Sequence, residues 1–338
     1  MRLREVARSL AVPMIGLGAG FAVAALAVLL SNGSPAESFS AMFRSALGSG
    51  AAVSETLVKT IPLVLTGLAV ALGLRAGLFN IGAEGQLLVG ALAAAWVGHA
   101  VRLPAIVHIP LCLSAGVIGG ALWAFIPGLL RAKRGVHEVI TTIMLNYTAF
   151  FLTHYLVTAV LKDPGTMAPQ TPEMHQSAWL ATLSETSVLH WGILISVLAV
   201  VGFRILMSRS VLGFEMKAVG LSPDAARTAG ISVPVTLLRA MLLSGALAGV
   251  AGAVEVMGIH HKFYDQFSPG YGFDSIAVAF LGNTTAVGTA LSAALFGALR
   301  NGAIGMSMDT DTPKEIVTLI QAIVIIFAGM KLIRRRKY

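Results

Sequence analysis

Charged residues are scarce in this sequence of 338 residues: Asp, Glu, Lys and Arg together make up only 12% of it. A soluble domain usually contains about twice that share. Hydrophobic residues make up 56%, and the mean hydropathy is +0.81. The apolar runs are continuous, not alternating, and several reach the roughly 20 residues with which a helix spans a bilayer. The composition therefore excludes a soluble globular domain and predicts an all-α, polytopic membrane protein.

Cysteine is almost absent, because Cys112 is the single one. One thiol allows neither an internal disulfide nor a thiolate metal cluster. The sequence also lacks a Gly-x-x-x-x-Gly-Lys-[Ser/Thr] motif, so it cannot bind ATP as a P-loop protein does. The net charge of +8 lies mostly beside apolar runs and does not indicate nucleic-acid binding. With no catalytic grouping and no metal site, we expect a protein that is not an enzyme and holds no cofactor.

Ten apolar runs are candidates for membrane-spanning helices. The first follows a basic N-terminus and lacks a small-residue cleavage pattern, so we expect an uncleaved span and not a signal peptide. The whole chain, 1–338, then forms a single transmembrane domain of about ten helices. The predicted spans lie near 11–30, 57–76, 81–98, 105–130, 139–160, 189–207, 236–257, 271–285, 287–306 and 315–332.

Basic residues are distributed unequally between the two sides of these spans. With the N-terminus inside, 17 of the 24 Lys and Arg residues lie on the inner side and 7 on the outer side. Cytoplasmic loops carry an excess of Lys and Arg. We therefore predict that both termini and the loop 208–235 are cytoplasmic and that the loop 161–189 is extracytoplasmic. The seven outer residues are Arg44, Lys59, Arg102, Lys162, Lys262, Arg300 and Lys314.

Three polar side chains interrupt the apolar sequence between the second and third spans: Asn80, Glu84 and Gln86. Intramembrane carboxylates are costly and tend to line transport pathways. Gly82 and Gly85 would let the helix break, which membrane proteins tolerate beside a cavity. We predict that the three side chains line a translocation pathway for a polar, uncharged ligand. The alternative is a tight cytoplasmic turn in which Glu84 is in water.

A second polar group follows the basic segment that ends at Arg134. Glu138, Thr142 and Asn146 are four residues apart and share one face of a helix. Glu138 and Asn146 are therefore further candidates for the pathway. In the alternative, Glu138 lies at the cytoplasmic interface and Asn146 bonds a neighbouring helix.

Glycine pairs at four-residue spacing occur at 16/20, 116/120 and 245/249. Such pairs let membrane helices approach closely, so we expect them at helix contacts.

The segment Gly220–Ile231 is a polar island that predicts a short capped helix. Ser222 is a good N-cap, Pro223 suits the first helical position, and Asp224 favours the positive end of the helix dipole. Alanines at 225, 226 and 229 give the helix a small face, and Gly230 can end it. On a cytoplasmic loop, such a helix is suited to a groove on another protein. The alternative is an ordinary capped surface helix.

The spacing Asp224-Ala225-Ala226-x-x-x-Gly230 resembles the Glu-Ala-Ala-x-x-x-Gly loop with which ABC import permeases dock onto their ATPase. Asp224, Ala225, Ala226 and Gly230 match this loop, and the predicted ATPase-coupling residues are Gly220, Ser222, Pro223, Asp224, Ala225, Ala226 and Gly230. Asp224 stands where that loop usually has Glu, which is a chemically mild change.

Three parts of the chain together carry a family resemblance. Ala76–Gln86 and Gly135–Asn146 resemble signature segments of bacterial nucleoside ABC permeases. Gly220–Ile231 together with Gly270–Gly282 is similar to the wider superfamily of branched-chain amino acid and ribose permeases. The resemblance implies a permease subunit of a nucleoside importer in the bacterial inner membrane. It also implies a second, different permease as a heterodimer partner, an ATPase chain that binds ATP, and an extracytoplasmic substrate-binding lipoprotein.

Two other functions stay open. One is an ion- or proton-coupled secondary transporter, in which Glu84, Glu138 and Glu255 titrate and the segment Gly220–Ile231 has no partner. The other is an ABC permease for a simple sugar such as ribose. Against the sugar, the residues after Gly282 lack the glycine-rich turn of many sugar permeases.

Overall fold

The computed structural model describes residues 2–185, 187–310 and 312–335. Most of these residues are helical. The described residues contain no β-strand, only two isolated β-bridges. The α-helices are α1 (Arg2–Leu30), α2 (Pro35–Leu47), α3 (Gly50–Arg75), α4 (Ala83–Ala100), α5 (Ala105–Arg134), α6 (Glu138–Tyr155), α7 (Gly192–Arg209), α8 (Val211–Leu221), α9 (Pro223–Thr228), α10 (Val233–Glu255), α11 (Tyr271–Leu281), α12 (Ala286–Asp309) and α13 (Glu315–Arg335). Short π-helices extend α6 (Leu156–Val160) and α10 (Val256–His260). The all-α prediction is confirmed.

Each of the ten predicted spans corresponds to a helix, but the sequence analysis missed α2 and α8. Both are short helices that begin at a serine N-cap, Ser34 for α2 and Ser210 for α8. Neither is long enough to cross a bilayer, since 13 and 11 residues extend only about 20 and 17 Å. A search for long apolar runs therefore passes over them.

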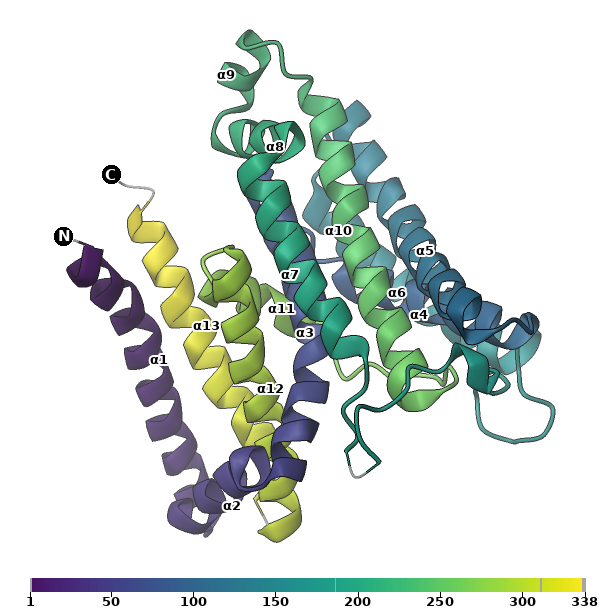
Figure 1. Ribbon diagram of the computed structural model, residues 1–338. Coiled ribbons are helices and arrows are strands. Elements are labelled where there is room, and N and C mark those ends of the chain that lie inside the picture. The colour runs from purple at the N-terminus through teal and green to yellow at the C-terminus, as the bar shows by residue number, and fades with distance from the viewer. Residues whose placement is uncertain (1, 186, 311, 336–338) are drawn as a thin grey trace.

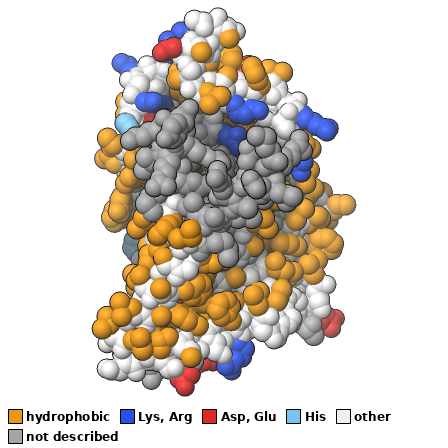
Figure 2. Space-filling model, turned by 90° about the vertical axis from the view of Figure 1, so that its left-hand side faces the viewer, with side chains coloured by type: hydrophobic (Ala, Val, Ile, Leu, Met, Phe, Trp, Pro, Cys, Tyr) orange, Lys and Arg blue, Asp and Glu red, His pale blue; other side chains and the backbone are white. Residues whose placement is uncertain are grey.

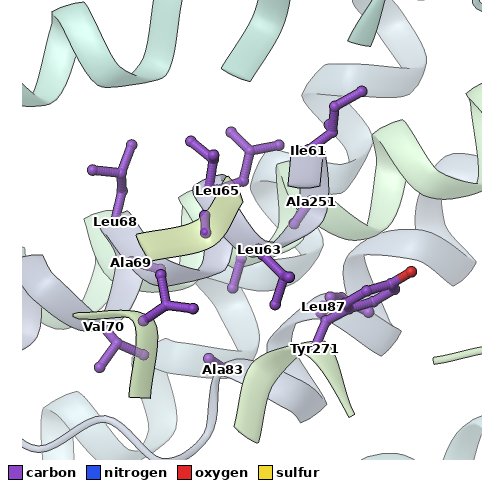
Figure 3. Close-up of a cluster of buried hydrophobic side chains, with 14 of the residues drawn as sticks. Ile61, Leu63, Leu65, Leu68, Ala69, Val70, Ala83, Leu87, Ala251 and Tyr271 are labelled. Carbon is purple, nitrogen blue, oxygen red and sulfur yellow. The ribbon is translucent and has the colours of Figure 1, made fainter. Parts of the chain in front are cut away.

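The middle of the molecule is built around α3, which is buried along nearly all of its length after Thr56. It packs against α10, α11 and α12. Figure 3 shows the centre of this core, where Leu65 and Leu68 of α3 lie among side chains that include Leu87, Ala251 and Tyr271. The helix is apolar on all sides because it has protein neighbours on all sides.

Close packing of α5 on α10 depends on the two glycine pairs at 116/120 and 245/249. A Cβ atom added to Gly120 would collide with the Gly245 carbonyl, and one added to Gly249 would collide with the Gly116 carbonyl. The backbones of the two helices therefore touch, as the four-residue spacing predicts.

Among the residues that the structure describes, five helices are long and apolar enough to cross a membrane: α3, α5, α7, α10 with its π-helical extension, and α6 with its own. The apolar parts of α1, α11 and α13 are shorter. The predicted span at 271–285 corresponds to α11, whose 11 residues cover only about half of the ~30 Å hydrocarbon layer. The last four residues of that stretch, 282–285, are non-helical chain.

The two ends of the bundle differ. Helices α8 and α9 lie at one end, together with the start of α1 and the end of α13, whereas α2 and the loop before α7 lie at the other (Figure 1). In Figure 2, hydrophobic side chains cover the flank, and most of the visible Lys and Arg gather at the end that carries α8 and α9. This is the charge distribution expected of a bundle with one cytoplasmic end.

Candidate functional site

The break between α3 and α4 brings polar groups into the bundle. After Arg75, the chain turns at Gly77, which has φ +80°, and continues without helical structure to Gly82. Gly77 faces Gly220 of α8, where an added Cβ would lie 3.2 Å from the Gly220 Cα. The unwound segment is therefore in direct backbone contact with the turn that leads into α9.

Asn80 and Gln86 form a closed pair of amides inside this break. The Asn80 Nδ2 donates to Gln86 Oε1 (2.9 Å), and Gln86 Nε2 donates back to Asn80 Oδ1 (3.1 Å). Asn80 also accepts from the Gly82 N–H (3.0 Å) and donates to Ser244 Oγ of α10 (2.9 Å). These bonds replace the backbone bonds that a continuous helix would make there.

Helix α6 completes the break from the other side. Asn146 Oδ1 accepts from the Gly85 N–H and its Nδ2 donates to the Ile81 carbonyl, both at 2.9 Å. Glu138 Oε1 accepts from the Phe79 N–H (3.2 Å), and its Oε2 lies 3.3 Å from Arg131 Nε.

Glu84 joins the break to the beginning of α11. Its Oε2 accepts a 2.6 Å hydrogen bond from the Gly272 N–H, in the first turn of α11. Its Oε1 is buried and makes no well-formed hydrogen bond to any other described residue. Ser268 and Arg300 lie in its surroundings. The N-terminal ends of α4 and α11 therefore meet at one carboxylate.

The structure thus brings all five predicted pathway residues together around the α3–α4 break. Each is buried: Asn80, Glu84, Gln86 and Asn146 are at most 1% exposed and Glu138 is 5% exposed. The alternative of a Glu84 in water does not agree with this burial. Sequence reasoning missed Ser244 and Gly272, because nothing near them in the sequence marks them as partners of residues 164 and 188 positions away.

At the other end of the bundle, the segment before α7 is fixed to the helices by backbone hydrogen bonds. Thr171 N–H donates to Phe263, Met174 N–H to His261, and Leu180 N–H to Met257. Among these contacts lies His190, which is 1% exposed. Burial and the neighbouring His261 lower the pKa of His190 to about 4. This end therefore presents a fixed surface made of irregular chain.

The histidines and acids at this end do not form a metal site. In the part of the chain that the structure describes, no group of three or more His, Cys, Asp and Glu side chains could hold a metal ion. His260 instead lies 3.7 Å from Glu255, to which the Tyr271 hydroxyl also donates (3.4 Å).

Helix α9 and its caps form as predicted. Ser222 Oγ accepts from the Ala225 N–H (3.3 Å), Pro223 is the first helical residue, and Gly230, with φ +83°, follows the end of the helix. Asp224 pairs with Arg227 at 3.1 Å, and both are well exposed.

The small face of α9 is divided, contrary to our expectation of one bare surface. Ala226 is 3% exposed and packs against Val219 and Val233, so it holds α9 to the rest of the chain. Ala225 and Ala229 remain exposed. Gly220 cannot carry a side chain here, because its Cβ would collide with the Arg75 carbonyl. The surface left for a partner therefore consists of Asp224, Ala225, Thr228 and Ala229, which are all exposed.

Comparison with known proteins gives a consistent result. The family model for the branched-chain amino acid transport system / permease component matches residues 52–329. The guanosine ABC transporter permease protein NupP of Bacillus subtilis is 44% identical over 326 residues, which cover 95% of this chain and 93% of the relative. The nucleoside ABC transporter permease protein NupB of Lactococcus lactis is 38% identical over 336 residues, which cover 96% and 92%.

A third relative carries a different solute in its name. The glucose ABC transporter permease protein TsgB13 of Haloferax volcanii is 39% identical over 325 residues, which cover 93% of this chain and 86% of the relative. No solved structure matches the chain.

Proposed function

Because this chain belongs to the family of branched-chain amino acid transport system permease components, we propose that it is the permease subunit of a nucleoside-importing ABC transporter. The family makes it a multi-pass membrane subunit of a transport system in which a separate ATPase chain hydrolyses ATP. The observation that carries the nucleoside is the match over nearly the whole chain to two permeases named for guanosine and for nucleosides. A simple sugar is the second candidate, because a glucose permease matches at a similar level.

We propose that the solute passes beside the α3–α4 break and the start of α11. Asn80, Glu84, Gln86, Glu138 and Asn146 are collected there, at a point where two helices begin inside the bundle. Broken helices with polar groups at mid-membrane depth are the usual surroundings of a transport site. The hydrogen bonds from these residues to each other and to the neighbouring backbone would hold the edges of the pathway in place.

For the membrane arrangement, we propose one transmembrane domain over 1–338, with ten helices in the bacterial inner membrane and both termini in the cytoplasm. Support comes from the common end at which α1 starts, α13 ends and α9 lies (Figure 1). The loop 208–235, which contains α8 and α9, is then cytoplasmic, and the loop 161–189 is extracytoplasmic.

We propose that α9 docks onto the ATPase and that ATP is bound by that partner alone, with no cofactor in this chain. The contact between Gly220 and the Arg75–Gly77 turn supports this role. Through this contact, a displacement of α9 by the ATPase would be transmitted to the α3–α4 break. The fixed outer surface at 161–189 is suited to a substrate-binding lipoprotein. A second, different permease would bring the second docking helix that an importer with two ATPase domains requires.

The substrate is tested by uptake into cells that express the complete importer and lack other nucleoside transporters. Labelled adenosine, guanosine, uridine, ribose and glucose are compared. We expect nucleosides to be taken up and both sugars to be excluded. Uptake of a sugar without any nucleoside would instead establish the second candidate.

A further inference from the structure

An ion pair lies beside the network described above without a hydrogen bond to any of its five predicted residues. Arg300 Nη2 of α12 lies 2.7 Å from Asp274 Oδ2 in the first turn of α11. The same nitrogen donates to the Pro269 carbonyl (3.1 Å), and the guanidinium stands 4.8 Å from the centre of the Tyr271 ring. Its place in the sequence predicted that Arg300 lies on the outer side of the membrane. In the structure, its guanidinium instead faces α11.

The depth of this pair is set by its position on α12. Arg300 lies 14 residues after Ala286 and 9 before Asp309, hence roughly 21 Å and 14 Å from the two ends of the helix. Neither end is close enough for the side chain to extend into bulk water by stretching along the helix. Charged groups at such depth face protein or a water-filled cavity, because lipid gives them no hydrogen bonds.

The pair nevertheless remains partly open. The side chains of Arg300 and Asp274 are 17% and 23% exposed on the chain surface. Arg300 Nη1 is buried without a hydrogen-bond partner among the described residues, and Asp274 Oδ1 accepts no hydrogen bond from any of them. Asp274 therefore keeps an unused acceptor on a partly exposed side chain, and the unpaired donor of Arg300 is buried beside it.

This surface adjoins the candidate pathway. Tyr271, which lies under the guanidinium, donates to Glu255, and the next residue, Gly272, donates to Glu84. Arg300 and Asp274 both interact electrostatically with Glu84. The five pathway residues are buried, and each bonds to groups within the protein, whereas this neighbouring pair is partly exposed.

We propose that Asp274 and Arg300 bind the vicinal hydroxyl groups of the transported solute. The carboxylate accepts from the hydroxyls, which are donors, and the guanidinium donates to a hydroxyl oxygen. The ribose of a nucleoside supplies such a diol, and so does a simple sugar. This assignment rests on the proposed import function and adds the contact residues and the part of the solute that they recognise.

Accessibility and protection test the contact directly. Asp274→Cys is placed in a Cys112→Ala background, and the complete importer is treated with a hydrophilic thiol reagent. We expect the thiol to react and millimolar adenosine to slow the reaction several-fold, while 2′,3′-dideoxyadenosine protects little. An unreactive thiol, absent protection, or equal protection by both compounds would overturn the proposal. Cross-linking of an unreactive thiol to the second permease would place the pair at a subunit seam instead.

Transport by Asp274→Asn gives a second measurement in case the cysteine variant does not fold. The variant keeps the shape but weakens the hydrogen bonds to the diol, so we expect the maximal adenosine uptake rate to fall about tenfold. Glu37→Gln is the matched control, because it also removes a carboxylate from the first turn of a helix, at an exposed position of α2 outside the pathway and the coupling loop. Its uptake should stay at the wild-type rate, and an undiminished rate in Asp274→Asn would overturn the proposal.

Adenosine uptake by the wild-type importer distinguishes a failure of the diol contact from a failure of the proposed import function. If it imports adenosine but Asp274 fails both tests, only the contact assignment is wrong. If it imports no nucleoside at all, the nucleoside function and the diol contact built on it fail together.

Discussion

Asn80 is the side chain on which the buried polar network most depends. Its amide takes part in four hydrogen bonds, to Gln86 twice, to Gly82 and to Ser244. Removing it would leave several buried donors and acceptors unpaired, at about 1–3 kcal/mol for each group. Asn80→Ala is therefore expected to lower the amount of folded protein as well as transport, which makes it a poor probe of the pathway alone.

Glu84 allows a cleaner test. Glu84→Gln keeps an oxygen that can accept from the Gly272 N–H, replaces the other oxygen by an amide NH2, and removes the ability to carry a negative charge. We expect a normal amount of protein, a maximal uptake rate lowered about tenfold, and a nearly unchanged apparent affinity, because the binding protein sets the latter. The measurement is uptake kinetics with labelled nucleoside.

The control for this variant is Glu37→Gln on the exposed surface of α2, which should transport normally. Wild-type kinetics in Glu84→Gln would contradict a role of Glu84 in the pathway. The carboxylate would then have a structural role only.

His190 makes the outer end sensitive to acid. Its Nδ1 accepts from the Gly192 N–H (3.1 Å), a bond that protonation would abolish. Because the pKa of His190 is lowered from 6.5 to about 4, its contribution to stability is complete above pH 6.5 and declines as the pH falls toward 4. At pH 5 the loss is about 2 kcal/mol.

Thermal unfolding of the purified protein between pH 8 and pH 5 measures this loss. His190→Asn keeps an acceptor and removes the titration, so its melting temperature should change less over that range. Equal pH dependence in the two proteins would contradict the assignment to His190.

At the scale of elements, α9 shows how far the sequence determines a docking surface. The caps at Ser222 and Gly230 follow from local chemistry and are present as predicted. Which alanine faces outward does not follow from spacing alone, because it depends on the packing of Ala226 against Val219 and Val233. Only the folded chain decides this.

Bulk on the exposed side of α9 should therefore uncouple the importer. We expect Ala229→Trp to leave the permease folded in the membrane and to reduce both ATPase co-purification and uptake by about tenfold, the effect of overfilling a close contact. Ala181→Trp, an exposed alanine at the other end, should not change co-purification. Full co-purification and uptake with Ala229→Trp would mean that α9 does not dock.

For the molecule as a whole, apolar runs predict the long helices well, because lipid requires every backbone group to be bonded within its own helix. They fail at α11, where the stretch 271–285 suggested a span and the structure has a helix of 11 residues that begins beside Glu84. They also give no sign that Arg300 pairs with Asp274. Both features are set by contacts between distant helices, which no local pattern encodes.

The proposed orientation makes a prediction for intact cells. In a Cys112-free protein, a cysteine at Ser177 should react with an impermeant thiol reagent, and one at Ser222 should react only after the membrane is opened. The loop before α7, which contains Ser177, and helix α9, which directly follows Ser222, lie at opposite ends of the bundle (Figure 1). Labelling of both positions in intact cells would contradict the proposed topology.

The most direct test of the account is the energy source of transport by the purified complex. The permeases, the ATPase and the binding protein are reconstituted in proteoliposomes with the ATPase side accessible, and labelled guanosine movement is measured. We predict transport that requires ATP hydrolysis and continues when a protonophore collapses the proton gradient. Transport by this chain without the ATPase, driven by an ion or proton gradient, would contradict the account.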